Sequence, residues 1–271
     1  MELFTLYRLI ALDIDGTLVR PDGSVSEADR EAIAHARRSG ARVVLCTGRS
    51  WQESEEVAEE AGCDRVMVCQ GGAALADLDR RCNTRLWEIP RDAALELVGW
   101  LEREELALML FAGSELVVNP RSEETFRSYP SPGFHRCKVV AQEPARFLRE
   151  RGLPVNKIYA QGDPAIFPPL LERAARCREV TVTSSAPYNF EIVPAGVDKG
   201  TGLAALAEEL GLTLAETIAI GDSDNDRGML AAAGMPVAMG NATDAIKAMA
   251  RYVTDTNENG GVARAIRNFI P

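Results

Sequence analysis

The chain has 271 residues, of which 46% are hydrophobic and 26% are charged, a balance typical of a globular protein. Its formal net charge of −10 argues against nucleic acid or an anionic membrane as the main partner. The length favours one large domain or two domains of moderate size.

The six cysteines contain no Cys-x-x-Cys pair, and the two histidines are too few for a zinc cluster. We therefore expect reduced cysteines in the core of a cytoplasmic protein. The first apolar stretch has no basic region before it, so we expect no signal peptide. The sequence also lacks an uninterrupted apolar run of about 18 residues, which excludes a membrane-spanning helix.

The first third of the chain alternates strands and helices. Ser26 and Ser50 are expected to cap the two helices at their N-termini, and Gly40 and Gly62 to end them. Strands separated by helices of this length predict a parallel sheet. The predicted strands are 9–14, 42–46 and 65–69, and the predicted helices are 26–39 and 50–61.

The last third repeats this alternation, whereas the middle of the chain differs. Residues 85–184 hold 14 basic and 14 acidic side chains and a cluster of prolines and turn residues. We predict a core made of 1–84 plus 185–271, with 85–184 inserted as an α+β domain with an antiparallel sheet. In the insert we expect helices at 92–104 and 168–178 and strands at 116–118, 138–141, 157–160 and 179–183. In the last third we expect helices at 200–210, 226–233, 243–250 and 262–269 and strands at 217–220, 236–239 and 252–254.

Two aspartates, Asp13 and Asp15, follow the first apolar run. Because a strand repeats every two residues, we expect both carboxylates on one face. Two neighbouring negative charges at the end of a buried strand are costly unless a cation or a reaction offsets them. The glycine and the threonine that follow, Gly16 and Thr17, suit a tight turn next to a metal and a phosphoryl group.

Further polar residues follow the other strands of the predicted parallel sheet, where ligands bind beyond the carboxyl ends. Thr47 and Gly48 follow the second strand, and an acidic run from 221 to 226 follows the strand at 217–220. Lys199 stands at a predicted helix start. The carboxylates favour Mg²⁺, Thr47 and the amides near it would hold phosphate, and Lys199 would add positive charge. An aspartate beside a metal and a lysine can attack phosphorus, and its neighbour can carry the proton.

These segments together resemble the four motifs of the haloacid dehalogenase (HAD) superfamily, in its Cof-like subclass IIB with a C2-type cap. The resemblance covers both outer segments and implies an α/β fold, a Rossmann-like parallel-sheet core with an inserted α+β cap. It departs at Gln70-Gly71-Gly72, where the subclass has Asn-Gly-Ala. The motifs are Asp13-Ile14-Asp15-Gly16-Thr17-Leu18, Thr47-Gly48-Arg49, Lys199 in Val197-Asp198-Lys199-Gly200, and Gly221-Asp222-Ser223-Asp224-Asn225-Asp226.

The resemblance also implies a role for each motif residue. Asp13 would be the nucleophile and a Mg²⁺ ligand, and Asp15 the general acid and base whose carbonyl also meets the metal. Asp222 would complete the protein ligands, and Asp226 would support the metal or bind it. The phosphate would be held by Thr47, Gly48, Lys199 and Asn225.

We therefore predict a cytoplasmic, Mg²⁺-dependent phosphatase, a monomer or homodimer, that hydrolyses a small phosphomonoester through a phosphoaspartate. Sugar phosphates are the favoured substrates, followed by phosphorylated cofactors such as flavin mononucleotide or pyridoxal phosphate. The alternatives are a phosphomutase and a phosphate-binding sensor without turnover. Four basic residues of the insert would attract an anionic substrate or form an ordinary solvated surface: Arg121, Arg127, Arg136 and Lys138.

Overall fold

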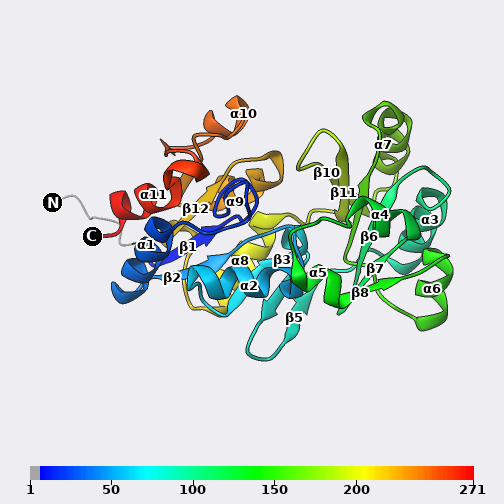
Figure 1. The fold of residues 1–271 in the computed structure, drawn as a ribbon, viewed down its shortest axis with the longest axis horizontal. Helices are drawn as coiled ribbons and strands as arrows, with labels where there is room; N and C mark the ends of the chain where they lie inside the picture. The colour runs from blue at the N-terminus through cyan, green and yellow to red at the C-terminus, as the bar shows by residue number, and fades with distance from the viewer. Residues whose placement is uncertain (1–6) are drawn as a thin grey trace.

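The computed structural model describes residues 7–271 of the protein. Residues 1–6 lie outside the described residues. They form the start of the predicted core and of the segment on which the signal-peptide expectation rests. The chain folds into two lobes, with the C-terminus and α1 at the far end of the first lobe (Figure 1). Among the described residues, no helix is long and apolar enough to cross a membrane.

The first lobe, which we call the core, is built on a five-stranded sheet whose neighbouring strands are all parallel. The predicted alternation of strands and helices is confirmed. From edge to edge the strands are β14 (Tyr252–Val253), β13 (Met235–Ala238), β12 (Thr217–Gly221), β1 (Leu9–Leu12) and β2 (Arg42–Leu45). The helices are α1 (Glu27–Arg38), α2 (Trp51–Ala61), α8 (Lys199–Glu209), α9 (Arg227–Ala232), α10 (Asp244–Lys247) and α11 (Gly261–Phe269).

The capping residues that the sequence indicated lie at the ends of these helices. Ser26 accepts a hydrogen bond from the backbone N–H of Asp29 at the start of α1. Ser50 forms a capping box with Glu53 at the start of α2, and Gly62 ends that helix in the left-handed conformation. Such caps stabilise a helix by about 1 kcal/mol each, so local sequence determines where these helices begin and end.

A small antiparallel sheet adjoins the core and was not predicted in full. Its first strand, β3 (Val66–Cys69), forms a bridge to the end of β2 through Val68 and Cys46. It continues through a short turn, η1 (Gln70–Gly72), into β4 (Ala74–Asp77) and β5 (Cys82–Leu86). The small residues of β4 have low strand propensity, which explains why the sequence pattern misses it.

The second lobe, which we call the cap, contains the elements from α3 to β11. Its six-stranded sheet is antiparallel except where β7 and β8 pair in parallel. In order the strands are β10 (Val180–Thr183), β11 (Asn189–Pro194), β9 (Lys157–Gln161), β6 (Ala107–Ala112), β7 (Glu115–Val118) and β8 (Lys138–Val140). The helices are α3 (Arg91–Leu101), α4 (Pro120–Thr125), α5 (Pro132–Cys137), α6 (Pro144–Arg151) and α7 (Phe167–Ala175).

Both predicted ends of the cap lie too early in the chain. β5 continues to Leu86 in the sheet that adjoins the core, so the boundary at 84 cuts a strand. β11, which pairs with both β10 and β9, was assigned to the core by the boundary at 184. Its backbone hydrogen bonds are made to cap strands, and the sheet therefore extends to Pro194.

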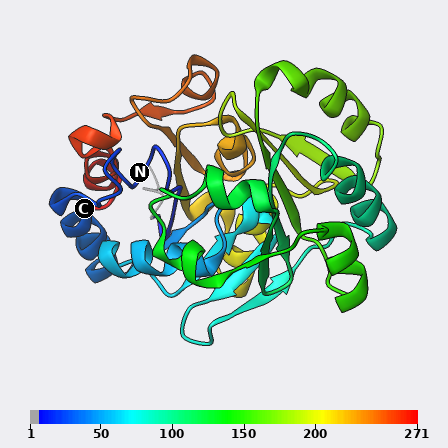
Figure 2. The same ribbon diagram turned by 45° about the vertical axis from the view of Figure 1, so that its right-hand side comes forward.

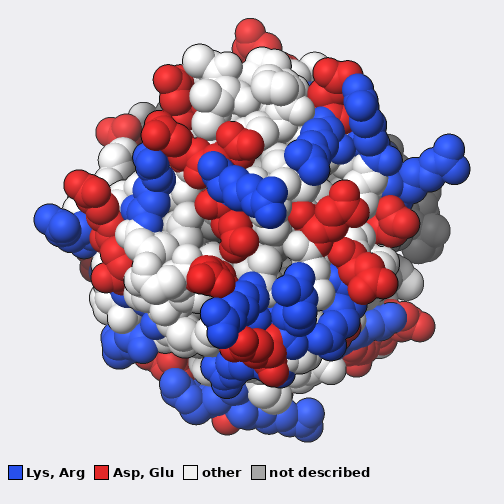
Figure 3. Space-filling model, turned by 90° about the vertical axis from the view of Figure 1, so that its right-hand side faces the viewer, with Lys and Arg blue, Asp and Glu red and all other residues white. Residues whose placement is uncertain are grey.

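The cap is closed onto the core through α5, which packs on α2. In Figure 2 the bright green segment that contains α4 and α5 lies in front of the core. A Cβ on Gly133 of α5 would lie 1.8 Å from the carbonyl oxygen of Gln52, so glycine permits this close approach. The far end of the cap carries interspersed basic and acidic side chains (Figure 3), in keeping with its balanced charge.

Candidate active site

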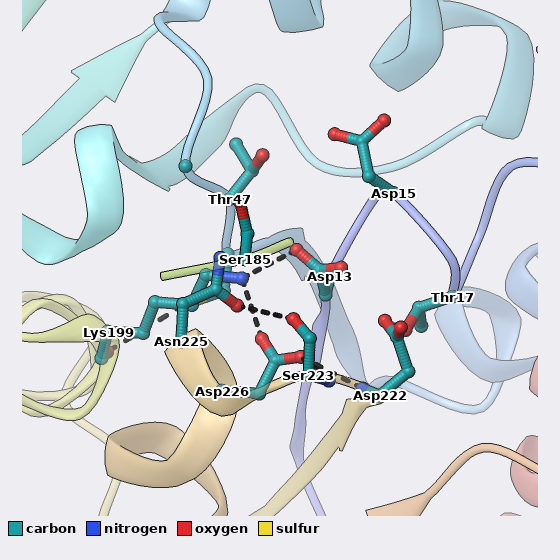
Figure 4. A network of polar contacts seen from close by, with 12 residues as sticks. Asp13, Asp15, Thr17, Thr47, Ser185, Lys199, Asp222, Ser223, Asn225 and Asp226 are labelled. Atoms are coloured by element: carbon teal, nitrogen blue, oxygen red, sulfur yellow. Dashed lines mark hydrogen bonds and ion pairs between the residues drawn. The ribbon is translucent and has the colours of Figure 1, made fainter. Parts of the chain in front are cut away.

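The predicted site residues come together at the carboxyl ends of the parallel strands. Asp13 follows β1, Thr47 follows β2, and Asp222 follows β12. Lys199 is the first residue of α8, which has Asp198 as its N-cap. Figure 4 shows Lys199 reaching between Asp13 and Asp226, with Thr17 beside Asp222 and Asp15 turned away from them.

Lys199 bridges two carboxylates at the centre of this site. Its Nζ lies 2.6 Å from Asp13 Oδ1 and 2.6 Å from Asp226 Oδ1. All three side chains are buried, and Lys199 and Asp226 are completely inaccessible. Burial lowers the pKa of Lys199, but the charges of Asp13 and Asp226 outweigh burial and hold that pKa well above its ordinary value. The lysine is therefore a fixed positive charge beside Asp13.

The acidic loop after β12 is fixed by hydrogen bonds to its own backbone. Asp226 Oδ2 accepts from the N–H groups of Asp222 and Ser223, at 2.9 and 3.0 Å. Thr17 Oγ1 donates to Asp222 Oδ1 at 2.9 Å and joins the loop to the first motif. Gly16, at φ +82°, allows this approach, because a Cβ there would lie 2.5 Å from Asp222 Oδ2.

Three carboxylates of the site could hold a cation. One oxygen from each of Asp13, Asp222 and Asp226 lies within 4.8 Å of the others. With Lys199 the cluster carries a formal charge of about −2, which a divalent cation would neutralise. Burial raises the pKa of Asp222 to about 6, with the charge of Asp226 adding to the shift. Burial likewise raises the pKa of Asp13, although Lys199 opposes the shift. An all-oxygen donor set of this kind fits Mg²⁺.

Asp15 does not share a face with Asp13, and this expectation was wrong. β1 ends at Leu12, and the chain turns at residues 14–18, so strand alternation no longer applies. The carboxylate of Asp15 instead accepts two hydrogen bonds from Arg49, from Nε at 2.9 Å and from Nη2 at 2.6 Å. Arg49 is buried, whereas the side chain of Asp15 is 59% exposed.

The site opens into a cavity of about 260 Å³ between the core and the cap. Five of the predicted residues line it: Asp13, Asp15, Gly48, Asp222 and Asn225. The remaining three, Thr47, Lys199 and Asp226, are completely buried beneath it. Thr47 accepts a hydrogen bond through Oγ1 from the N–H of Arg49, at 3.1 Å.

The chain matches known proteins over nearly the whole of the fold described above. The family model of haloacid dehalogenase-like hydrolases matches residues 10–266, from β1 to α11. The chain belongs to the haloacid dehalogenase-like hydrolases. This family membership confirms the predicted family and the prediction of a HAD-type hydrolase, while the C2 type of the cap stays a prediction.

Relatives of this hydrolase match over nearly the whole length. Phosphatase YwpJ of Bacillus subtilis (strain 168) is 31% identical over 287 residues, covering 97% of this chain and 100% of that protein. The 5-amino-6-(5-phospho-D-ribitylamino)uracil phosphatase YcsE of the same organism is 31% identical over 263 residues, covering 97% and 96%. A solved haloacid dehalogenase-like hydrolase from B. subtilis has a TM-score of 0.83 at 30% identity, covering 96% and 99%. The first two relatives, which are named phosphatases, confirm the predicted enzyme class.

Sequence reasoning identified none of the residues of the hydrolase that face the cavity from the cap. Lys157 of β9 and Glu191 of β11 form an ion pair there, with Nζ and Oε2 2.8 Å apart. No motif signalled them, because cap closure alone brings them to the core. Further lining residues are Glu53 of α2 and the cap residues Met109, Phe111, Phe126, Tyr129, Tyr159, Ser185, Ala186, Tyr188 and Asn189.

The four basic cap residues singled out from the sequence are absent from the cavity lining among the residues the structure describes. Arg136 pairs with Glu56 of α2 at 2.9 Å, and Lys138 pairs with Glu123 at 2.6 Å. Arg121 lies 3.7 Å from Glu105. These contacts favour the reading as an ordinary charged surface.

Proposed function

We propose that the protein is a Mg²⁺-dependent phosphatase that hydrolyses a small phosphomonoester through a phosphoaspartate on Asp13. The observation that supports this most is the Asp13–Lys199 contact of 2.6 Å at the floor of the cavity. Lys199 occupies Oδ1 of Asp13, and no hydrogen bond from the described residues reaches Oδ2. We assign Oδ2 as the attacking atom.

In the first step, Asp13 Oδ2 attacks phosphorus and the bond from phosphorus to the ester oxygen breaks. The departing oxygen takes a proton from Asp15, which leaves Asp15 as a carboxylate. Asp15 lies at the cavity and is more than half exposed, so its side chain has room to turn from Arg49 toward the leaving group. The product alcohol then leaves, and the phosphoryl group remains on Asp13.

In the second step, a water molecule attacks the phosphorus of the phosphoaspartate and gives a proton to Asp15. The bond from phosphorus to Asp13 breaks, inorganic phosphate leaves, and both aspartates return to their starting states. Lys199, fixed by Asp226, stabilises the carboxylate of Asp13 as it departs.

Asp13 and Asp222 are the side chains that would hold Mg²⁺, together with the backbone carbonyl of Asp15. Asp226, whose two oxygens accept from Lys199 and from backbone N–H groups of its own loop, would support the metal or bind it. When bound, Mg²⁺ would neutralise charge on the phosphate oxygens. The phosphate would also contact Thr47, Gly48, Lys199 and Asn225. Asn225 lies close to Gly48, since a Cβ on that glycine would be 4.0 Å from Asn225 Nδ2.

Sugar phosphates remain the first substrate class that we propose. The cavity also favours phosphorylated cofactors that carry a ring, because aromatic side chains stack on planar groups. YcsE, at 31% identity, is named for a substrate that joins a ribityl phosphate to a uracil ring. The aromatic residues that line the cavity are Phe111, Phe126, Tyr129, Tyr159 and Tyr188.

A panel of phosphomonoesters assayed with Mg²⁺ tests the proposal. The panel should contain sugar phosphates, flavin mononucleotide and pyridoxal phosphate, with inorganic phosphate and isomerised sugar phosphate measured separately. Release of inorganic phosphate supports a phosphatase. Isomerisation without release would instead identify a phosphomutase, and the absence of both across the panel would favour a sensor.

A further inference from the structure

A single lysine of the cap reaches into the phosphate-binding loop of the core. Lys157 Nζ donates a hydrogen bond to the carbonyl oxygen of Gly48 at 2.9 Å. Lys157 belongs to β9 of the cap, and Gly48 follows β2 of the core, 109 positions earlier in the chain. The lysine side chain is only 2% exposed, so this contact is sealed from solvent.

The cap provides the charge partner that makes such a buried ammonium tolerable. Glu191 of the adjacent strand β11 lies 2.8 Å from Lys157 Nζ and is 4% exposed. Its Oε2 has no aligned hydrogen bond from the described residues, so this contact is ionic, and the directed hydrogen bond goes to Gly48. The cap therefore presents a neutralised pair whose donor points at the core.

Two glycines of the core make room for this pair. A Cβ on Gly48 would lie 3.0 Å from Lys157 Nζ and 3.7 Å from Glu191 Oε1. A Cβ on Gly71, in the turn after β3, would lie 3.9 Å from Glu191 Oε2. The ion pair thus lies between the loop that follows β2 and the turn that follows its neighbour β3.

The peptide between Gly48 and Arg49 is held at both of its ends. Its carbonyl accepts from Lys157, and its N–H donates to Thr47 Oγ1 at 3.1 Å. This peptide carries the side chain of Arg49, which holds Asp15. A displacement of the peptide would therefore disturb both Thr47 and the proposed proton carrier.

We propose that Lys157 is a positioning residue that fixes the Gly48–Arg49 peptide when the cap is closed, and so makes phosphate binding in the core depend on the cap. The inference rests on the proposed function, which assigns phosphate to the Thr47–Gly48 loop. Glu191 acts through Lys157, by holding its ammonium group in place.

The test compares Lys157→Met, Glu191→Gln and the double variant with the wild-type chain. Lys157→Met leaves a buried carboxylate without its partner, which lowers stability on its own account. The double variant removes both charges and restores stability while the hydrogen bond to Gly48 stays absent. Lys138→Met is the matched control, because Lys138 is also a cap lysine in an ion pair, at 2.6 Å from Glu123, and lies outside the cavity lining.

The decisive readout is the affinity for inorganic phosphate with Mg²⁺, measured by calorimetry beside the melting temperature. Inorganic phosphate has no organic part for the cap to contact, so a change in its affinity reports on the phosphate-binding end of the cavity and not on the substrate body. We expect Lys157→Met and the double variant to bind inorganic phosphate at least about tenfold more weakly than the wild type. This factor corresponds to the loss of one hydrogen bond from a charged group. The double variant should melt closer to wild type than Lys157→Met, and Lys138→Met should bind normally.

Wild-type phosphate affinity in the double variant would overturn the inference, whether or not turnover falls. The inference would also be overturned if Lys157→Met and the double variant bound an organic phosphate more weakly but inorganic phosphate as the wild type does. Lys157 would then contact the organic part of the substrate. A wild-type chain that binds phosphate but hydrolyses no ester would refute the proposed function alone. The calorimetric comparison of variants would still test Lys157.

Discussion

Arg49 holds Asp15 through two hydrogen bonds, 2.9 Å from Nε and 2.6 Å from Nη2. The guanidinium also lies over the ring of the cap residue Tyr129, with its Cζ 5.6 Å from the ring centroid. Arg49 therefore contacts the proposed proton carrier on one side and the closed cap on the other. The second motif supplies this arginine directly after the phosphate loop.

Arg49→Lys should lower kcat, because a lysine cannot reproduce the two parallel hydrogen bonds that set the position from which Asp15 turns toward the leaving group. We expect a fall of about tenfold or more, in line with the strength of charge-assisted hydrogen bonds. Steady-state kinetics on the best substrate of the panel provide the measurement. Arg136→Lys is the control, since its ion pair with Glu56 lies on the surface. Equal effects of the two substitutions would contradict the role of Arg49.

Asp15→Asn should slow hydrolysis of alkyl phosphates by about 10²–10⁴-fold, the usual contribution of a general acid. An aryl ester such as p-nitrophenyl phosphate has a leaving group that needs no protonation, so its loss should be smaller. The comparison of kcat for the two esters is the measurement. The assignment of Asp15 as general acid is wrong if both esters lose the same factor.

Removal of Mg²⁺ with a chelator should abolish turnover, and Asp222→Asn should raise the Mg²⁺ concentration needed for half-maximal activity. Asp222 lines the cavity and belongs to the three-carboxylate cluster. Asp224→Asn is the control from the same loop, because its side chain is 59% exposed and pairs with Arg227. A metal titration in which the two variants behave alike would contradict the assigned ligands.

Asp29 predicts a pH dependence of stability that is independent of the active site. Burial raises the pKa of Asp29 above its ordinary value, although hydrogen bonds from Ser26 and from the N–H of Ala263 oppose the shift. The native state then keeps a proton that the unfolded chain has lost, so this group lowers stability as pH rises above about 4. Asn at position 29 cannot ionise.

Urea unfolding of the wild type and of Asp29→Asn between acidic and neutral pH measures this effect. The stability of the variant relative to the wild type should increase with pH through that range. A difference that stays constant would show that Asp29 does not titrate abnormally.

Local sequence determined much of the fold because caps and alternation act over a few residues. Ser26 and Gly62 mark the ends of helices as expected, and the core strands lie where apolar runs predicted them. β11 was missed although β10 directly precedes it, because its other partner, β9, lies on the far side of α7 in the chain. Its buried Glu191 also interrupts the apolar pattern expected of a buried strand.

The candidate site was predictable where residues directly follow core strands, since the sheet itself brings those positions together. Asp13 and the loop of Asp226 accordingly lie close together, and Lys199, at a predicted helix start, contacts both aspartates. Lys157 was not predictable, because a lone lysine in a cap strand is ordinarily solvated and only closure of the cap buries it. The orientation of Asp15 depended on a turn that strand periodicity does not describe.

The central claim is that Asp13 becomes phosphorylated during turnover, and trapping the intermediate tests it most directly. The wild-type enzyme would be mixed with its best substrate, quenched in acid within one turnover and reduced with borohydride, which converts an acyl phosphate to an alcohol. Mass spectrometry of the peptide that contains Asp13 should then find homoserine at this position. The Asp13→Asn variant should show neither homoserine nor turnover of the substrate. Rapid release of phosphate with an unmodified Asp13 at every quench time would contradict the account.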